Sequence, residues 1–287
     1  MSDVWRALPA AGAMVAWGVM DFLVKMVVDR ISTRTTLLGS QVAGIVLCLV
    51  VMPFGASLPM PRGSLWVPLV LAGLAYVVGN LSLFEAFARG PLSIVSPISS
   101  SYGAAAALLA VVVLGEHVSW PGATAILVIA AGIVFASRLP GDGARVRRRA
   151  SVPGTTYALG AVIVMAPFSL LLAHLTKVLE PITIVFAVKL VAAAILAGIA
   201  ARAWREIRGA NLVVVITIIG ALDVAATWCY VQGIMTAGLS ITAPIAAGYP
   251  VVTVLLAQLL LREGLTAIQR LGVILVLGGV TALNVVG

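Results

Sequence analysis

The chain has 287 residues, of which 62% are hydrophobic and only 10% are charged. Soluble globular proteins are about 25% charged, so this chain has too few charged residues to cover a surface in contact with water. The composition therefore excludes a soluble enzyme and indicates an integral membrane protein. The two cysteines, Cys48 and Cys229, lie inside apolar stretches, so neither a disulfide framework nor a metal site is expected, and no cofactor is implied.

Ten apolar runs of helix length follow one another along the chain. Their connections are short except at residues 138–154, where Pro, Gly and clustered Arg indicate a linker. The predicted fold class is therefore all-α, with ten transmembrane helices divided by this basic linker into a first repeat, 1–137, and a second repeat, 155–287. The expected helical runs are 8–28, 35–53, 65–88, 92–114, 119–137, 155–176, 181–201, 211–236, 239–261 and 266–285.

The second half repeats the first at an offset of 147 residues. The segment Leu92-Ser93-Ile94 recurs as Leu239-Ser240-Ile241, and further equivalent positions share a proline, a tyrosine, a glutamate and glycines. Because these residues recur at fixed spacing without a gap, they indicate a duplication rather than the general similarity of apolar helices. The equivalent pairs are Pro97 and Pro244, Tyr102 and Tyr249, Glu116 and Glu263, Gly132 and Gly279, and Gly73 and Gly220.

Each half holds five of the predicted spans, so the second half enters the membrane from the opposite side and the two halves are inverted repeats. The two halves can then exchange two similar packings of their helices. A central site therefore opens to one face of the membrane and then to the other, as in a carrier. A channel is the alternative, but a duplication with unequal charges in the cavity suits alternating access better than a continuous pore. The chain has no P-loop motif, so ATP is not expected to drive transport.

The chain resembles the drug/metabolite transporter superfamily, and specifically its EamA-type ten-helix members. The resemblance rests on fourth and ninth spans that contain proline, followed by Leu-Gly-Glu (114–116) or Leu-Arg-Glu (261–263), a short loop and a last span with glycine. It covers nearly the whole chain and implies a transporter whose third, fourth, eighth and ninth helices line a central cavity. Gly272 and Gly279 also resemble close-packing glycines of small multidrug resistance relatives, and packing between helices is the preferred interpretation here.

The positive charges are divided unevenly between the two faces of the predicted bundle. The face with both termini holds 3 Lys and Arg residues, and the opposite face holds 14. By the positive-inside rule, a multi-pass protein of the plasma (inner) membrane then has both termini outside, although similar family members usually have cytoplasmic termini. Because the charges are dispersed between spans, the net charge of +8 predicts contact with membrane lipid and no nucleic-acid partner.

Two ionisable residues are expected near the middle of the membrane, where an unpaired charge is costly. Lys189 lies about 12 Å along a helix from Pro181, and an overlay of the halves places it opposite Gln41. Asp223 lies in the middle of the eighth span and corresponds to Tyr76. Both ionisable residues are predicted to bind substrate. The alternatives are that Lys189 is paired permanently with a carboxylate such as Asp223, or that Asp223 is a neutral acid hydrogen-bonded to a neighbouring helix.

Asp21 and Lys25 are four residues apart in the first span and therefore share one helix face. They form either a self-neutralising pair or a cavity-facing Asp21 beside a Lys25 that extends toward the membrane surface. Asp21 and Asp223 are the candidates for binding a coupling proton, although facilitated diffusion needs none. Glu116 and Glu263 are expected to be structural acids at the N-termini of the fifth and tenth helices.

Aromatic and amide side chains within the spans complete the predicted substrate site. A tyrosine ring packs against an apolar ligand while its hydroxyl forms hydrogen bonds, and the face of a ring attracts a cation. The alternative for such a tyrosine or tryptophan is an anchor at the membrane interface. The residues assigned to the cavity wall on this basis are Tyr76, Asn80, Tyr102, Trp228, Tyr230 and Tyr249.

Pro97 and Pro244 are predicted hinges. They occupy equivalent positions in their spans, and each proline removes a backbone hydrogen bond and loosens the local turn. The alternative is that each proline lies in the first turn of a helix that begins later than the apolar run.

The sequence therefore predicts a secondary transporter of a small organic metabolite, and a cavity with both signs of charge favours an amino acid or related zwitterion. If Lys189 is instead neutralised by Asp223, the remaining Asp21 and the tyrosines suit organic cations, including quaternary ammonium and multidrug substrates. A membrane-embedded enzyme is a distant alternative, because His117 and His174 are scattered and no metal-ligand spacing occurs. The expected partners are the substrate, protons in a coupled mechanism and membrane lipid, for a monomer or weak dimer.

Overall fold

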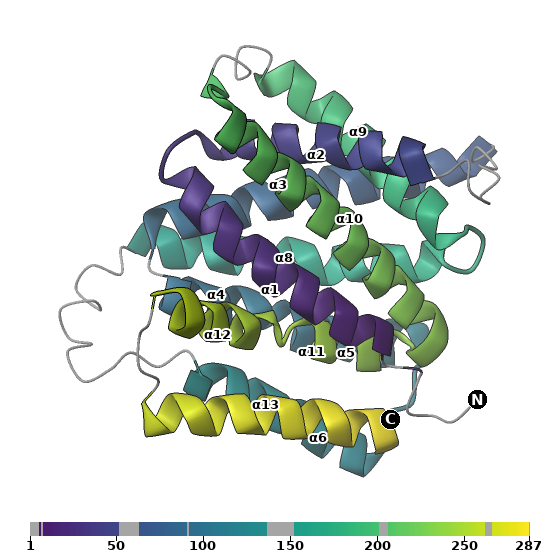
Figure 1. The fold of residues 1–287 in the computed structure, drawn as a ribbon. Helices are drawn as coiled ribbons and strands as arrows, with labels where there is room; N and C mark the ends of the chain where they lie inside the picture. The colour runs from purple at the N-terminus through teal and green to yellow at the C-terminus, as the bar shows by residue number, and fades with distance from the viewer. Residues whose placement is uncertain are drawn as a thin grey trace.

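The computed structural model describes residues 6, 8–51, 63–90, 92–136, 152–200, 206–261 and 266–286. These residues form α-helices, one short 3-10 helix and the turns between them (Figure 1). The first half contains α1 (Leu8–Val28), α2 (Thr33–Val51), η3 (Gly63–Leu65), α3 (Trp66–Arg89), α4 (Leu92–Ser100), α5 (Tyr102–Leu114) and α6 (Trp120–Ala136). The second half contains α8 (Val152–Leu175), α9 (Pro181–Ala200), α10 (Ala210–Ala237), α11 (Leu239–Ala246), α12 (Tyr249–Leu261) and α13 (Ala267–Val286).

The predicted linker, 138–154, lies outside the described residues as far as residue 151. Its last residues belong to α8, which begins at Val152. The other outer ends of the predicted runs agree with the observed helices to within a turn, because apolar composition alone marks where a membrane helix begins and ends.

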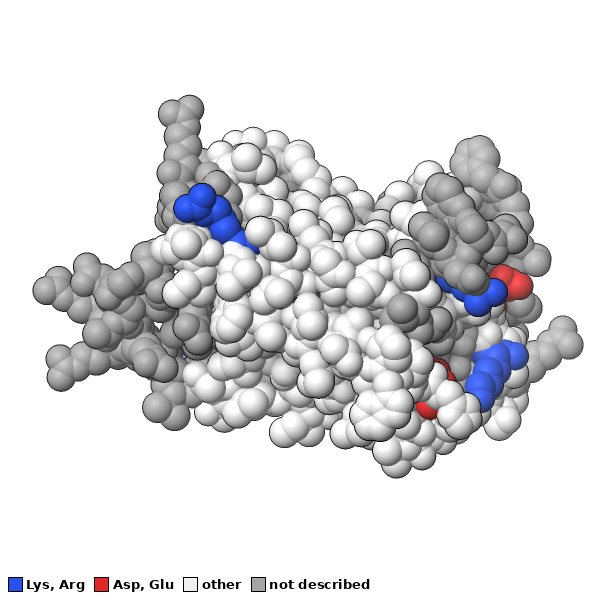
Figure 2. All heavy atoms as spheres, turned by 90° about the horizontal axis from the view of Figure 1, so that it is seen from below, with Lys and Arg blue, Asp and Glu red and all other residues white. Residues whose placement is uncertain are grey.

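Eight helical segments of the described chain are long and apolar enough to cross a membrane, and the apolar helices Trp120–Ala136 and Ala267–Leu283 are shorter. Large apolar side chains face outward along these helices, including Ile163 at 73% exposure and Leu127 at 70%. Figure 2 shows one face of the molecule, on which uncharged residues fill the middle and the described charged residues lie toward the two ends. An apolar belt between charged ends matches a lipid bilayer between two aqueous phases.

Each of the predicted runs 92–114 and 239–261 is broken into two helices, α4 and α5 in the first half and α11 and α12 in the second. Pro97 lies inside α4 and Pro244 inside α11, and each helix ends within one turn after its proline. A proline removes the backbone hydrogen bond to the residue four positions before it and so loosens the preceding turn, whereas these breaks lie three to four residues after each proline. The alternative that these prolines lie in first turns is therefore wrong, and their action as hinges stays a prediction.

Helices of the two halves pack against each other in corresponding pairs. In Figure 1, α1 lies along α10 and α6 lies along α13, and α3 also packs on α8. A Cβ atom on Gly132 of α6 would lie 2.8 Å from the backbone N of Val276, and one on Gly279 of α13 would lie 3.2 Å from the backbone N of Ile129. These two contacts correspond residue by residue at the offset of 147. The glycines therefore serve close packing between helices, as the sequence predicts.

We expect Gly272→Ala to destabilise the protein, because a Cβ atom at this position would overlap the backbone N of Ala136 and would lie 2.7 Å from the Gly132 carbonyl oxygen. Backbone atoms cannot rotate away, so α6 and α13 must separate, and such overpacking costs about 1–3 kcal/mol. Gly278→Ala on the same helix is the matched control, because nothing lies within 4 Å of its Cβ position. Thermal unfolding in detergent should show a lower Tm for Gly272→Ala and an unchanged or higher Tm for Gly278→Ala, since alanine favours a helix. Equal melting temperatures for the two variants would contradict the close contact.

Candidate functional site

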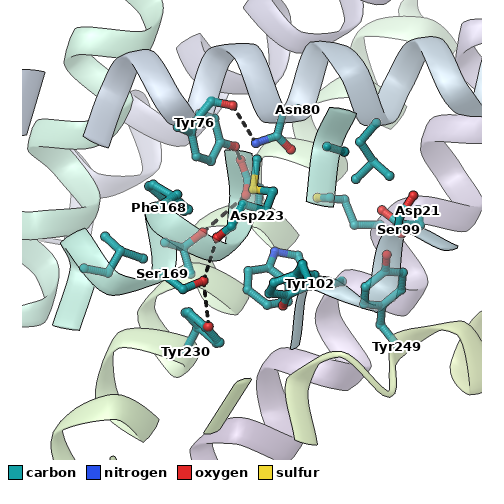
Figure 3. A pocket seen from close by; sticks show the side chains of 17 residues that line it. Asp21, Tyr76, Asn80, Ser99, Tyr102, Phe168, Ser169, Asp223, Tyr230 and Tyr249 are labelled. Carbon is teal, nitrogen blue, oxygen red and sulfur yellow. Dashed lines mark hydrogen bonds between the residues drawn. The ribbon is translucent and has the colours of Figure 1, made fainter. Parts of the chain in front are cut away.

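A cavity lies between the helices near the middle of the bundle (Figure 3). Aromatic and aliphatic side chains make up most of its wall, and no three His, Cys, Asp or Glu side chains of the described chain come together as ligands for a metal ion. The lining residues are Trp17, Met20, Asp21, Tyr76, Asn80, Leu83, Ser99, Tyr102, Ala161, Met165, Phe168, Ser169, Leu172, Asp223, Thr227, Tyr230 and Tyr249.

Most residues predicted for the substrate site lie in this wall, but Lys189 and Trp228 do not. Lys189 is buried behind Asp223, and Trp228 is 41% exposed on another side of α10. On α10, Asp223, Thr227 and Tyr230 share one helix face, and Trp228 projects away from it because successive residues are rotated by about 100°. The placement of Trp228 in the cavity wall is therefore wrong. The predicted residues that do line the cavity are Asp21, Tyr76, Asn80, Tyr102, Asp223, Tyr230 and Tyr249.

Lys189 and Asp223 form an ion pair in the interior. The Lys189 Nζ lies 2.7 Å from the Asp223 Oδ2, and the two side chains are 1% and 4% exposed. The same oxygen accepts hydrogen bonds from the Tyr76 hydroxyl and from the Gln41 Nε2 at 3.3 Å, while the Thr227 hydroxyl donates to the Asp223 Oδ1 at 3.3 Å. This network satisfies the carboxylate and neutralises the ammonium, which is the pairing that the sequence left open as an alternative.

The members of this network correspond to one another in the two halves of the chain. Tyr76 and Asp223, which hydrogen-bond directly, are 147 residues apart, which is the offset of the repeat. Gln41 and Lys189, which the overlay places opposite each other, both donate to Asp223. The Lys189 Nζ also lies 5.4 Å from the centroid of the Tyr76 ring, within reach of a cation–π contact. Equivalent positions of the two halves therefore meet at the side of the cavity.

Asp21 has no such network, although it is only 2% exposed. Within the described residues, no side chain forms an ion pair or a hydrogen bond with its carboxylate. The Lys25 Nζ instead lies 3.1 Å from the Asp29 Oδ1 and donates a hydrogen bond to the Phe87 carbonyl at 2.8 Å. The interpretation of Asp21 and Lys25 as a self-neutralising pair is therefore wrong, and Asp21 faces the cavity while Lys25 extends toward the helix end.

Aromatic side chains line the cavity that Asp21 faces. Figure 3 shows Asp21 beside Ser99 and Tyr249, on the opposite side of the cavity from Asp223. The rings of Trp17 and Tyr230 also line the cavity, with their centroids 5.1 Å apart and their planes inclined by 51°. A carboxylate without a counterion in a cavity lined by aromatic rings is a combination that attracts a cation.

The cavity also contains residues that the sequence did not assign to it, notably Thr227 on α10 and Phe168 and Ser169 on α8. Thr227 could have been predicted, because it follows Asp223 by four residues and so shares its helix face. Phe168 could have been predicted as well, because the offset of 147 makes it the equivalent of Asp21. Ser169 is joined to the site by the Tyr230 hydroxyl, which lies 2.9 Å from the Ser169 Oγ and comes from a helix far away in the chain.

We expect Lys189→Met to lower stability by about 3–5 kcal/mol, because it leaves the buried Asp223 charge without its counterion. Adding Asp223→Asn to Lys189→Met should recover part of the loss, since the amide carries no charge. Asp29→Asn is the control, because its pair with Lys25 has side chains that are 56% and 29% exposed, and exposed pairs contribute at most about 1 kcal/mol. This change leaves the hydrogen bond from Lys25 to the Phe87 carbonyl in place. Thermal unfolding in detergent measures all three, and a double variant less stable than Lys189→Met alone would refute the explanation.

Comparisons with known proteins place this geometry in a family. The model of the EamA-like transporter family matches residues 5–138 and again residues 152–285. An uncharacterized transporter of Archaeoglobus fulgidus is 32% identical over 179 residues, which are 58% of this chain and 61% of that relative. An uncharacterized protein of Methanocaldococcus jannaschii is 27% identical over 128 residues, which are 44% of this chain and 93% of that protein.

The fold also matches a known crystal structure. The two chains superimpose with a TM-score of 0.76 at 15% identity, and the match covers 96% of this chain and 95% of the other. Two matches to one family model account for the repeated sequence, and the apolar helices account for its membrane-like composition. The chain belongs to the EamA-like transporter family and is a multi-pass integral membrane protein.

Proposed function

We propose that this chain is a secondary transporter that moves small organic cations by alternating access. The observation that carries the proposal is the Asp21 carboxylate, which lines an aromatic cavity and has no partner among the described residues, while the Lys189 ammonium is neutralised by Asp223. The family membership supports transport as the activity. The charge and shape of the cavity support the class of substrate.

The proposed architecture has ten spans in two inverted repeats. Eight helical segments are long enough to cross the membrane, and α6 and α13 supply the remaining two as shorter, tightly paired spans. With five spans in each half, the second half runs through the membrane in the opposite sense. The mirrored contacts of Gly132 and Gly279 support a two-fold relation between the halves, and so does the direct hydrogen bond between the equivalent residues Tyr76 and Asp223.

Unequal packing of equivalent helices supports alternating access. We call the membrane face at which α5 ends and α11 begins the terminal face, and the opposite one, at which α4 begins and α12 ends, the linker face. Among the described residues, α5 packs on α11 more extensively than their equivalents α12 and α4 pack on each other. A Cβ atom on Gly103 of α5 would lie 2.7 Å from the Ala243 carbonyl oxygen of α11. An inverted-repeat transporter changes state when its two halves exchange a tight and a loose packing of equivalent helices. The tightly packed pair, α5 and α11, lies at the terminal face, so we take this face to be the closed one.

The geometry favours a cation over the zwitterion that the sequence favoured. An amino acid needs a positive group for its carboxylate, and Lys189 was the candidate. The Lys189 ammonium lies 2.7 Å from Asp223 and does not line the cavity. Asp223 is in turn neutralised, so Asp21 sets the sign of the charge that a ligand meets. Asp21 is also the remaining candidate for proton coupling, in which a proton and a cation would compete for one carboxylate.

The unequal charge of the two faces supports an orientation. With 14 of the Lys and Arg residues on the linker face, the proposed arrangement in the plasma (inner) membrane has the linker face in the cytoplasm and both termini outside. We further propose that the chain works as a monomer or a weak dimer.

Three ligands with the same phenyl group and different charge test the substrate class. Phenethylamine is a cation, phenylalanine a zwitterion and phenylpropionate an anion. A ligand that binds only the folded protein at 100 times its Kd adds about 2.7 kcal/mol of stability, so phenethylamine should raise the Tm in detergent while phenylpropionate should not. If phenylalanine instead gave the largest rise in Tm, the proposed cationic substrate would be wrong and an amino acid would be favoured.

Asp21→Asn should abolish the rise in Tm with phenethylamine, because the amide has the same shape and no charge. Asp29→Asn, which removes an exposed carboxylate from the end of the same helix, should preserve it. Reconstituted into liposomes, the unmodified chain should show saturable counterflow of the cation, whereas flux that does not saturate would indicate a channel. A full response in Asp21→Asn would show that the ligand binds elsewhere.

A further inference from the structure

Glu116 joins the two halves of the chain at the terminal face. It lies in the turn after α5, and its carboxylate accepts hydrogen bonds from the backbone N of Leu239 at 3.0 Å and of Ser240 at 2.8 Å. The Ser240 hydroxyl donates a third hydrogen bond at 2.6 Å. All three donors belong to the first turn of α11. A carboxylate from the first repeat thus caps a helix of the second.

This contact differs from the capping role predicted for Glu116, which was at the start of the following helix. The start of α6 has another cap, since the Gly122 backbone N donates to the Ser119 Oγ at 3.1 Å. The N-cap residue of α11, Gly238, has no side chain to satisfy the exposed N–H groups. Glu116 supplies both the acceptors and a negative charge at the positive end of the helix. Glu263, its sequence counterpart, lies outside the described residues.

Gly238 is shaped to admit the carboxylate. Its φ of +82° is one that other residues rarely adopt, and a Cβ atom there would lie 2.9 Å from the Glu116 Oε2. Any side chain at this position would therefore strain the backbone and crowd the carboxylate at once. The glycine and the glutamate form one contact between segments that are 122 residues apart.

The contact lies at the outer end of the closed α5–α11 interface. At the inner end, Gly103 approaches the Ala243 carbonyl, and α12 then brings Tyr249 into the cavity wall. Separation of α11 from α5, which opening of the terminal face requires, cannot occur without breaking the three hydrogen bonds of Glu116. Hydrogen bonds to a charged group are stronger than those between neutral groups. Because these bonds form only in the closed state, they shift the equilibrium toward that state.

We propose that Glu116 is a latch that holds the terminal face of the cavity closed and is released once in each transport cycle. The latch rests on the proposed alternating access, and it makes Glu116 a positioning residue that sets the conformational equilibrium without touching the substrate. Loss of its charge should favour the state that is open to the terminal face by about tenfold, which corresponds to about 1.4 kcal/mol.

Sided labelling of a cysteine in the cavity tests the latch. In a chain whose two native cysteines are replaced by alanine, Ser99→Cys places a thiol in the cavity wall and His117→Cys marks the terminal face. A membrane-impermeant maleimide is added to intact cells and to inverted vesicles, and the side that labels His117→Cys identifies the terminal face. Glu116→Gln should raise labelling of Ser99→Cys from that side by about tenfold.

A second variant and a control keep the result specific. Gly238→Ala displaces the carboxylate without removing its charge and should produce the same shift, so the test survives if Glu116→Gln does not fold. Glu206→Gln is the control, because this carboxylate also accepts a backbone hydrogen bond, from the Ser32 N at 2.8 Å, but lies at the linker face. It should leave the labelling unchanged.

The two proposals fail in different ways. Labelling from the terminal face that stays at the unmodified level in both Glu116→Gln and Gly238→Ala would overturn the latch, even if phenethylamine still raises the Tm. If the labelling shifts but the chain binds no cation, the latch is supported and the proposed class of substrate is wrong.

Discussion

The burial of charge in an apolar bundle is the constraint on which the arrangement of this protein depends. Lys189 and Asp223 are almost fully buried, and moving two charges out of water costs several kcal/mol unless their hydrogen-bonding groups are satisfied. Asp223 meets this condition by accepting hydrogen bonds from Lys189, Tyr76, Gln41 and Thr227. These donors come from α9, α3, α2 and α10, so a single carboxylate holds four helices together. The cavity forms directly beside this point.

The same constraint gives the cavity its chemical character. Because Lys189 and Asp223 neutralise each other, they contribute a fixed dipole rather than a free charge. Asp21 remains without a partner among the described residues, although burial makes an unpaired carboxylate costly. A fold retains such a cost where a ligand or a proton removes it during function. The aromatic rings of the cavity wall can compensate the charge of a cation but not that of a carboxylate, which supports the proposed cationic substrates.

The features that depend on local composition could be predicted from the sequence. The contacts between side chains that are distant in the chain could not. Helix ends followed from apolar runs, and the duplication followed from spacing. The partner of Lys25 did not follow, because Asp21 and Asp29 are both four residues away and only the packed helices decide between them. Trp228 was misplaced because its depth in the membrane was read without its direction around the helix. The bonds of Glu116 to α11 cross from one half to the other, and no local pattern marks them.

In the proposed two-fold arrangement, distance from the axis decides which contacts can persist through a transport cycle. Equivalent residues can touch only near the axis that relates them, as Tyr76 and Asp223 do, and the exchange of the two packings displaces such residues least. The ion pair of Lys189 and Asp223 can therefore stay formed in both states and act as the pivot. Glu116 lies at the membrane face, where the displacement is largest, so its hydrogen bonds must break. The charges of Lys189 and Asp223 are thus kept paired near the axis, while Glu116 lies at the membrane face, where water can replace the hydrogen bonds that it loses.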